Sequence, residues 1–184
     1  MVVGAITFSL AVIVSIASSF FLENISSLLL GFLLLLVIIF INVIFDAIGT
    51  AATAATEPPF HAKAADRVVG ANEAVFLVRN ADRVANYCGD VVGDVCGTIS
   101  GAIGATIALR LIIKQPTLDE LIISVFMSAV IATITVGGKA VGKTLAVEEA
   151  NEIIFAVGRI LAGLKRAVGR STKPEVRKAS KKGK

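Results

Sequence analysis

Four long apolar stretches, each bounded by polar or turn-forming residues, dominate the hydropathy pattern of the chain. They cover roughly residues 3–22, 27–48, 87–113 and 121–141. A helix of about 20 apolar residues crosses the hydrocarbon core of a bilayer, which is about 30 Å thick. We therefore expect four transmembrane helices. Only the short polar break at Glu23-Asn24 separates the first two, so we expect these two to form an antiparallel hairpin.

The pattern changes in residues 49–86, where apolar side chains are interleaved with basic ones at helical spacing. Apolar Val68 and Val75, for example, alternate with Lys63 and Arg67. Such a segment is typical of amphipathic helices that lie along a membrane surface. We expect two helices here, broken near Gly70, and a short soluble helical hairpin is the alternative.

The chain divides into two regions on this pattern. Residues 1–147 are expected to form a transmembrane domain that includes the cytosolic helical segment 49–86. Residues 148–184 are expected to form an amphipathic helix, near 148–168, followed by a basic cytosolic tail that ends in Lys181-Lys182-Gly183-Lys184.

Composition supports the assignment to the membrane. Hydrophobic residues make up 55% of the 184, charged residues only 17%, and the mean hydropathy is +0.84. A soluble domain needs more polar surface than this. The first apolar stretch has no Lys or Arg at its start and no small-residue cleavage site, so we interpret it as a retained span. The predicted fold class is all-α, a polytopic membrane protein of about four transmembrane helices with cytosolic juxtamembrane amphipathic helices.

Basic residues predict the orientation in the membrane. More than half of the 18 Lys and Arg residues follow residue 158, and four lie in residues 49–86. The excess of Lys and Arg in cytoplasmic segments places both termini in the cytoplasm of a multi-pass cell-membrane protein. Anionic lipid is the expected partner of the basic tail, and a plain solvated tail is the alternative. We do not expect binding to nucleic acid.

A row of glycines opens the third apolar stretch. Gly89, Gly93, Gly97 and Gly101 recur every four residues and form one flat stripe on a helix. Small residues allow close helix approach in lipid, so Gly93 and Gly97 are predicted to lie in a helix–helix contact of a homodimer or of one chain. Leu35 is predicted to face lipid. Gly93→Leu should therefore disrupt folding or dimerisation, whereas Leu35→Phe should be tolerated.

Acidic residues in apolar surroundings are the candidate chemistry. Asp90 and Asp94 lie near the start of the third span, and Asp46 lies where the second span ends, on the same predicted side of the membrane. Carboxylate, amide and hydroxyl oxygens are the ligands that magnesium and calcium prefer. We predict a cation site whose ligands are Asp46, Asp90 and Asp94, helped by Asn86, Ser100 or Thr98. The open alternative is that Asp90 or Asp94 pairs with Lys139 or Lys143 without any ion.

Residues 137–144 match the phosphate-binding pattern G-x-x-x-x-G-K-T letter for letter. That loop needs a preceding buried strand and a later acidic residue on another strand, and the chain offers neither. We interpret the pattern as a glycine-broken helix end with two lysines at the cytoplasmic interface. No other catalytic constellation is evident, so we do not expect an enzyme, and magnesium is expected only as a substrate or ligand.

The order of motifs resembles the transmembrane domain of the CNNM/CorC family. The resemblance rests on Phe45-Asp46-Ala47, on Asn80-Ala81-Asp82-Arg83 and most of all on residues 138–147, and it covers about residues 30–165. It implies three spans with juxtamembrane helices, a dimer, and export of magnesium and other divalent cations. This chain departs from the family where Lys139 replaces an acidic residue and Gly142 replaces a proline, and it carries no CBS domains.

The sequence leaves two functions open. The first is divalent-cation transport, with magnesium expected, by a homodimer whose aspartates coordinate the ion. The second is a non-transporting membrane scaffold or regulatory subunit, in which Lys139 neutralises an aspartate and the glycine stripe binds another helix.

Overall fold

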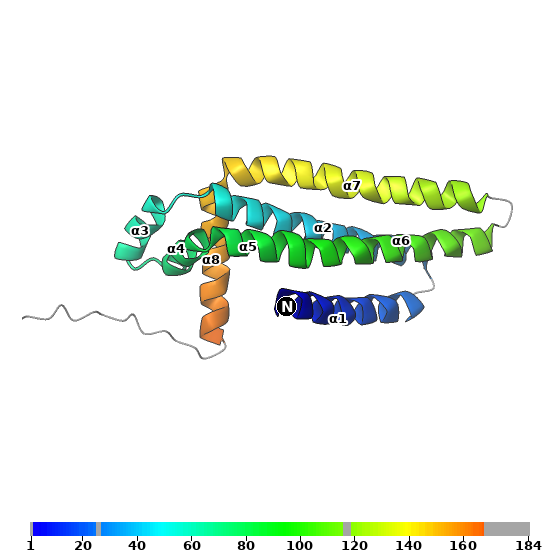
Figure 1. Ribbon diagram of the computed structural model, residues 1–184, viewed down its shortest axis with the longest axis horizontal. Coiled ribbons are helices and arrows are strands. Elements are labelled where there is room, and N and C mark those ends of the chain that lie inside the picture. The colour runs from blue at the N-terminus through cyan, green and yellow to red at the C-terminus, as the bar shows by residue number, and fades with distance from the viewer. Residues whose placement is uncertain (1, 25–26, 116–118, 168–184) are drawn as a thin grey trace, which may run out of the picture.

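The computed structural model describes residues 2–24, 27–115 and 119–167, and these residues form helices joined by short turns, with no strand among them. The long helices are α1 (Val2–Asn24), α2 (Leu28–Ala54), α6 (Asp94–Lys114) and α7 (Glu120–Glu148). The short ones are α3 (Pro58–Ala65), α4 (Ala71–Arg79), α5 (Ala81–Asn86), the π-helix η1 (Tyr87–Gly93) and α8 (Ala150–Ala167). Figure 1 shows the long helices side by side and α3, α4 and α8 gathered at one end.

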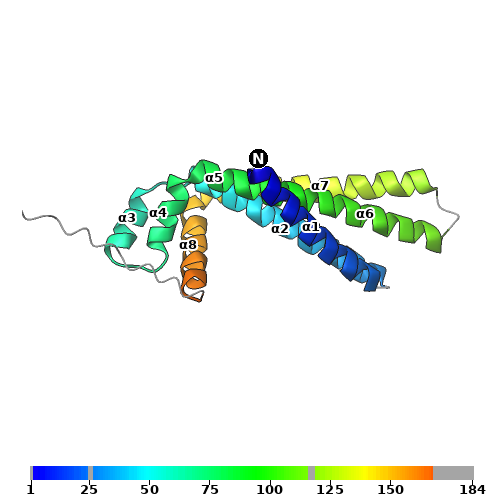
Figure 2. The ribbon, with the colours of Figure 1, turned by 60° about the horizontal axis from the view of Figure 1, so that its bottom comes forward.

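Three helices are long and apolar enough to cross a membrane. They are α2, the continuous rod of α5, η1 and α6 over residues 81–114, and α7. The predicted first span is shorter in its described apolar part, residues 4–20, and α1 lies along the outside of the bundle against α6 (Figure 2). The all-helical prediction and three of the four expected spans are therefore present as helices of sufficient length.

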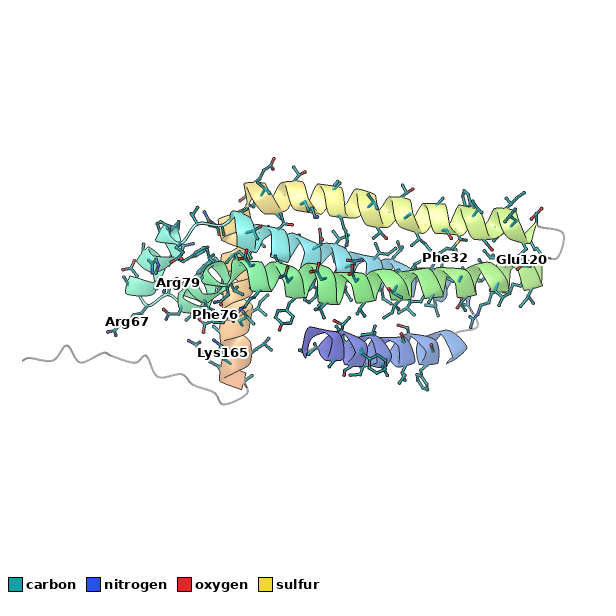
Figure 3. All side chains as sticks on the ribbon, viewed as in Figure 1. Phe32, Arg67, Phe76, Arg79, Glu120 and Lys165 are labelled. Carbon is teal, nitrogen blue, oxygen red and sulfur yellow. The ribbon has the colours of Figure 1, made fainter. Side chains whose placement is uncertain are left out.

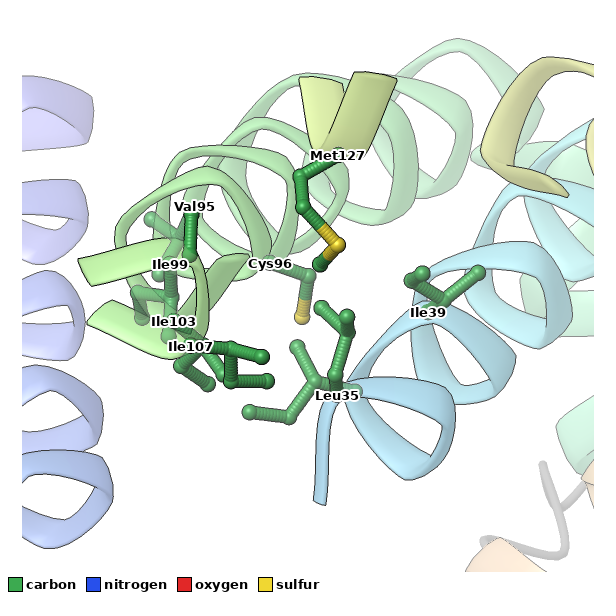
Figure 4. Packing of buried hydrophobic residues seen from close by; sticks show 10 residues of the cluster. Leu35, Ile39, Val95, Cys96, Ile99, Ile103, Ile107 and Met127 are labelled. Carbon is green, nitrogen blue, oxygen red and sulfur yellow. The ribbon is translucent and has the colours of Figure 1, made fainter. Parts of the chain in front are cut away.

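Aliphatic side chains of α2, α6 and α7 form the core between the long helices (Figure 4). Leu35 and Ile39 of α2 meet Ile103 of α6 and Met127 of α7, and all four are almost completely buried. The prediction that Leu35 faces lipid is wrong, because it is only 4% exposed. A continuous Leu, Ile and Val run has no polar side to mark its outer face, so its sequence does not reveal which residue faces inward.

The short helices α3, α4 and α8 pack around the end of α2 and form what we call the cap. Its core is built mainly from alanines, with Phe60 and Ile154 as the large buried side chains. Arg67 and Lys165 lie at the cap end of the molecule in Figure 3, and Glu120 lies at the far end of the bundle.

The helical structure of the cap is interrupted near Gly70, as the sequence predicted. Gly70 has a φ of +90°, a left-handed conformation in which glycine has no Cβ to strain, and Arg67 has a φ of 56°. The expected two helices of residues 49–86 are three, however, because the chain breaks again at Asn80. Its side-chain amide donates to the carbonyl oxygen of Phe76, which competes with helix continuation.

The G-x-x-x-x-G-K-T pattern lies inside α7, which runs without a break from Glu120 to Glu148. The prediction of a glycine-broken helix end at this pattern is therefore wrong, and the helix extends past the expected span end at residue 141. A continuous helix offers no loop of free backbone N–H groups for a phosphate. The pattern instead places Lys139 and Lys143 on one face, one turn apart.

Candidate functional site

A cluster of three charged side chains joins α2 to α7. The Lys139 ammonium lies 3.8 Å from Oδ1 of Asp46, and the Lys143 ammonium lies 3.5 Å from Oδ2 of the same carboxylate. The Asp46 side chain is only 11% exposed, whereas Lys139 is 27% and Lys143 54% exposed. One largely buried carboxylate is thus shared by an inner and an outer lysine, and the cluster carries a formal charge of +1.

Two glycines of α7 allow this approach. A methyl group built on Gly138 would lie 3.0 Å from Cγ2 of Val43, and one on Gly142 would lie 3.1 Å from Cγ1 of the same side chain. Both glycines therefore bring the backbone of α7 close to α2. The lysines that follow each glycine can then reach the carboxylate of Asp46, one turn beyond Asn42 on α2.

The glycine row of the third apolar stretch lies on a third side of the cluster, next to α2 and α7. A methyl on Gly93 would lie 3.4 Å from Oδ1 of Asn42 and 3.7 Å from the Lys139 ammonium, and Gly97 lies near the amide nitrogen of Asn42. The predicted helix–helix contact at Gly93 is confirmed within this single chain. Gly89 and Gly101 face open space, so only part of the row is a seam. Four residues exceed one α-helical turn of 3.6 residues, and the π-helix at residues 87–93 has a different number of residues per turn, so the row does not stay on one face.

Several buried oxygens in this region have no hydrogen-bond partner among the described residues. They are Oδ1 of Asn42, Oγ of Ser100, Oγ1 of Thr135 and Oδ2 of Asp46, the last of which contacts Lys143 only as an ion pair. Asn42 and Ser100 are each 1% exposed. An unpaired buried polar group costs about 1–3 kcal/mol, so a group of them calls for a functional explanation. Asp46 and Ser100 were among the predicted ligands, whereas Asn42 and Thr135 were not, although an Asn within an apolar run was a usable signal.

A groove of about 500 Å³ runs between α6 and α7 and ends near this cluster. Gly97 and Gly101 line one wall, and Ser128 and Thr135 line the other. Thr135 stands one helical turn before Lys139, and Gly97 borders Asn42. Thr135 is thus the one residue of the unpaired polar group that lines the groove.

The predicted metal ligands do not gather in this chain. Asp90, Asp94 and Asn86 are exposed, Ser100 is buried, and Asp46 is held by lysines. Within residues 2–24, 27–115 and 119–167, no three His, Cys, Asp or Glu side chains lie close enough to hold a metal ion. An acid does pair with Lys139 and Lys143, but it is Asp46 and not Asp90 or Asp94 as the alternative had it.

Searches among protein-family descriptions, curated proteins and solved structures found no match to this chain.

Proposed function

We propose that this chain is a multi-spanning membrane protein built like a divalent-cation transporter, in which Lys139 and Lys143 take the place of the cation. The bundle then acts as a non-transporting scaffold or regulatory subunit of a membrane complex, with the cap in the cytoplasm. The resemblance of residues 138–147 to the CNNM/CorC family supports the kinship, and Lys139 in place of that family's acidic residue supports the loss of transport.

The contact between Asp46 and the two lysines carries this proposal. A divalent cation needs the carboxylate free, and here two ammonium groups already neutralise it within 3.5 and 3.8 Å. Displacing them would leave two positive charges beside the ion at a site with little exposure to water. Coulomb repulsion at such a site is far stronger than in bulk water. The tethered lysines therefore oppose entry of magnesium.

Magnesium flux into liposomes that contain the purified protein tests the proposal. We expect no flux above that of protein-free liposomes, for the parent protein and for Asp46→Asn alike. Flux that depends on Asp46 would contradict the proposal. Asp90→Asn/Asp94→Asn is the matched variant for the outer acids, which touch neither lysine.

Divalent-cation transport is the second candidate, favoured by the unpaired buried oxygens of Asn42, Ser100 and Thr135 and by the groove that Thr135 lines. Oxygen donors of this kind suit magnesium, which binds one or two carboxylates and keeps several waters. Asp90 and Asp94 would join the pathway from the exposed side, in a homodimer. Loss of flux in Asn42→Leu as well as in Asp90→Asn/Asp94→Asn would establish it, whereas retained flux in both would remove these residues from the pathway.

A further inference from the structure

Arg159 and Arg166 of α8 have no acidic partner among the described residues, in contrast to three other cations of the cap. Arg79 pairs with Glu57 at 3.0 Å, Lys165 with Glu73 at 3.3 Å and Lys63 with Glu152 at 3.8 Å. The guanidinium groups of Arg159 and Arg166 are both exposed and lie on one side of the helix, two turns apart. The cap thus neutralises its other α8 cation, Lys165, and leaves these two available.

The backbone beside these arginines packs closely against the turn at residues 67–70. A methyl on Gly158 would lie 2.5 Å from the carbonyl oxygen of Gly70, and a methyl on Gly70 would lie 2.6 Å from the backbone nitrogen of Arg159. The turn at residues 67–70 is therefore pressed directly against α8. This contact places Val69 next to the arginines and forms an open pocket of about 520 Å³ between them.

The pocket combines charge with exposed apolar surface. Its lining includes Arg159, Arg166, Val69 and Ile160. Val69 is 42% exposed and Ile160 63% exposed, and Leu164 one turn beyond Ile160 is 57% exposed. Large apolar side chains with this exposure, flanked by Arg, are typical of helices that lie in the membrane interface.

The orientation of α8 agrees with that location. In Figures 1 and 2 the helix lies crosswise to α2, α6 and α7 at their cap end. If these three helices cross the bilayer, α8 runs parallel to its surface. The exposed apolar residues of α8 then lie at the level of the headgroups, together with Arg159 and Arg166.

We propose that the pocket between the turn 67–70 and α8 binds the phosphate headgroup of an anionic phospholipid. Arg159 and Arg166 bind the phosphate, since the guanidinium group pairs with phosphate oxygens in a bidentate manner. Val69 and Ile160 contact the upper acyl chain. The residues of this site all lie in the described cap, and the proposal holds whether or not the bundle transports an ion.

Native mass spectrometry of the full-length protein in detergent tests the site with added phosphatidylglycerol or phosphatidylcholine. We expect tighter binding of phosphatidylglycerol, and about 30-fold weaker binding of it in Arg159→Gln/Arg166→Gln. The variant Arg83→Gln/Lys114→Gln removes the same charge elsewhere and should bind nearly as the parent does. Equal binding by the parent and the α8 variant, or an equal loss in both variants, would overturn the proposal.

A photoreactive phosphatidylglycerol tests the parent protein without any substitution, in case the α8 variant fails to fold. Cross-linked peptides should map to residues 67–70 and 159–166. Cross-links confined to the long helices or to residues 168–184 would overturn the proposal.

Discussion

The aliphatic core of the long-helix bundle and the core of the cap are packed in different ways. In the bundle, large aliphatic side chains such as Ile103 and Met127 interdigitate between helices. In the cap, alanines and glycines let backbones touch, as at Gly70 and Gly158, around a single fully buried aromatic ring, Phe60. Side chains can repack after a substitution, whereas a backbone contact has no freedom to adjust. The cap is therefore expected to be the less tolerant region to added volume.

Charge shows the same contrast. In the cap, Glu57 pairs with Arg79 and Glu152 with Lys63 at positions where both side chains are at least 35% exposed, and such pairs contribute about 0–1 kcal/mol. Glu73 is 15% exposed, but its partner Lys165 is 49% exposed. The bundle holds one largely buried carboxylate, Asp46, between two lysines. Removing one partner of such a buried pair leaves a charge without compensation, which costs about 3–5 kcal/mol. The buried carboxylate of the bundle is therefore expected to contribute more to the free energy of unfolding than the exposed ion pairs of the cap.

The sharpest comparison substitutes one glycine in each region. Gly70→Ala adds a methyl against the backbone of Arg159 and strains a φ of +90°, so we expect a loss of about 4 kcal/mol in the free energy of unfolding. Gly104→Ala meets only the flexible end of the Ile131 side chain, and the better helix propensity of alanine, about 1 kcal/mol, should offset the repacking. Thermal unfolding in detergent measures both. Equal losses would contradict the contrast between backbone and side-chain packing.

The loss of stability caused by a substitution in the charged cluster should increase with the burial of the substituted side chain. Asp46→Asn leaves two lysines unpaired and should cost about 3–5 kcal/mol. Lys139→Gln should cost less, because Lys143 still neutralises the carboxylate, and Lys143→Gln, whose side chain is 54% exposed, should cost about 0–1 kcal/mol. Chemical unfolding of the three variants gives the order. A larger loss for Lys143→Gln than for Lys139→Gln would contradict the assignment of inner and outer lysine.

The seam at Gly93 predicts an intermediate effect. Gly93→Leu places a side chain against Asn42 and Lys139 and should cost about 1–3 kcal/mol through overpacking. Leu33→Phe is the matched control in place of Leu35→Phe, because Leu33 is 56% exposed. Yield and melting temperature of the two variants provide the measurement, and indistinguishable values would show that Gly93 tolerates volume.

The smallest expected effect concerns pH in the cap. Hydrogen bonds from His61 and Arg79 hold the pKa of the Glu57 carboxyl below its ordinary value. A lowered pKa contributes stability above the ordinary glutamate pKa, and this contribution is lost as the pH falls through the lowered value. The melting temperature of the parent should therefore fall slightly more on acidification than that of Glu57→Gln. The melting temperature of Glu148→Gln, a substitution at an exposed position, should depend on pH as that of the parent does. Identical pH curves for all three proteins would show that Glu57 makes no pH-dependent contribution to stability.

Hydropathy predicted the helical class and the long helices because a run of 20 apolar residues has few alternatives to a membrane helix. The break at Gly70 was predictable from glycine alone. The pairing of Asp46 with Lys139 was not, because it depends on how α7 rotates against α2. The positions of Asp90 and Asp94 in the sequence predicted that they lie on the same side of the membrane as Asp46. These positions carried no information on which face of the rod of residues 81–114 the two side chains occupy. The inward direction of Leu35 was hidden for the same reason.

The coupling energy between Asp46 and Lys139, measured with and without saturating magnesium, tests the central claim most directly. A double-mutant cycle with Asp46→Asn and Lys139→Gln isolates the interaction between the two side chains. If the lysines take the place of the cation, the coupling is favourable and magnesium leaves it unchanged. A coupling near zero, or one that magnesium abolishes, would contradict the account, because the carboxylate would then be free to bind the metal ion.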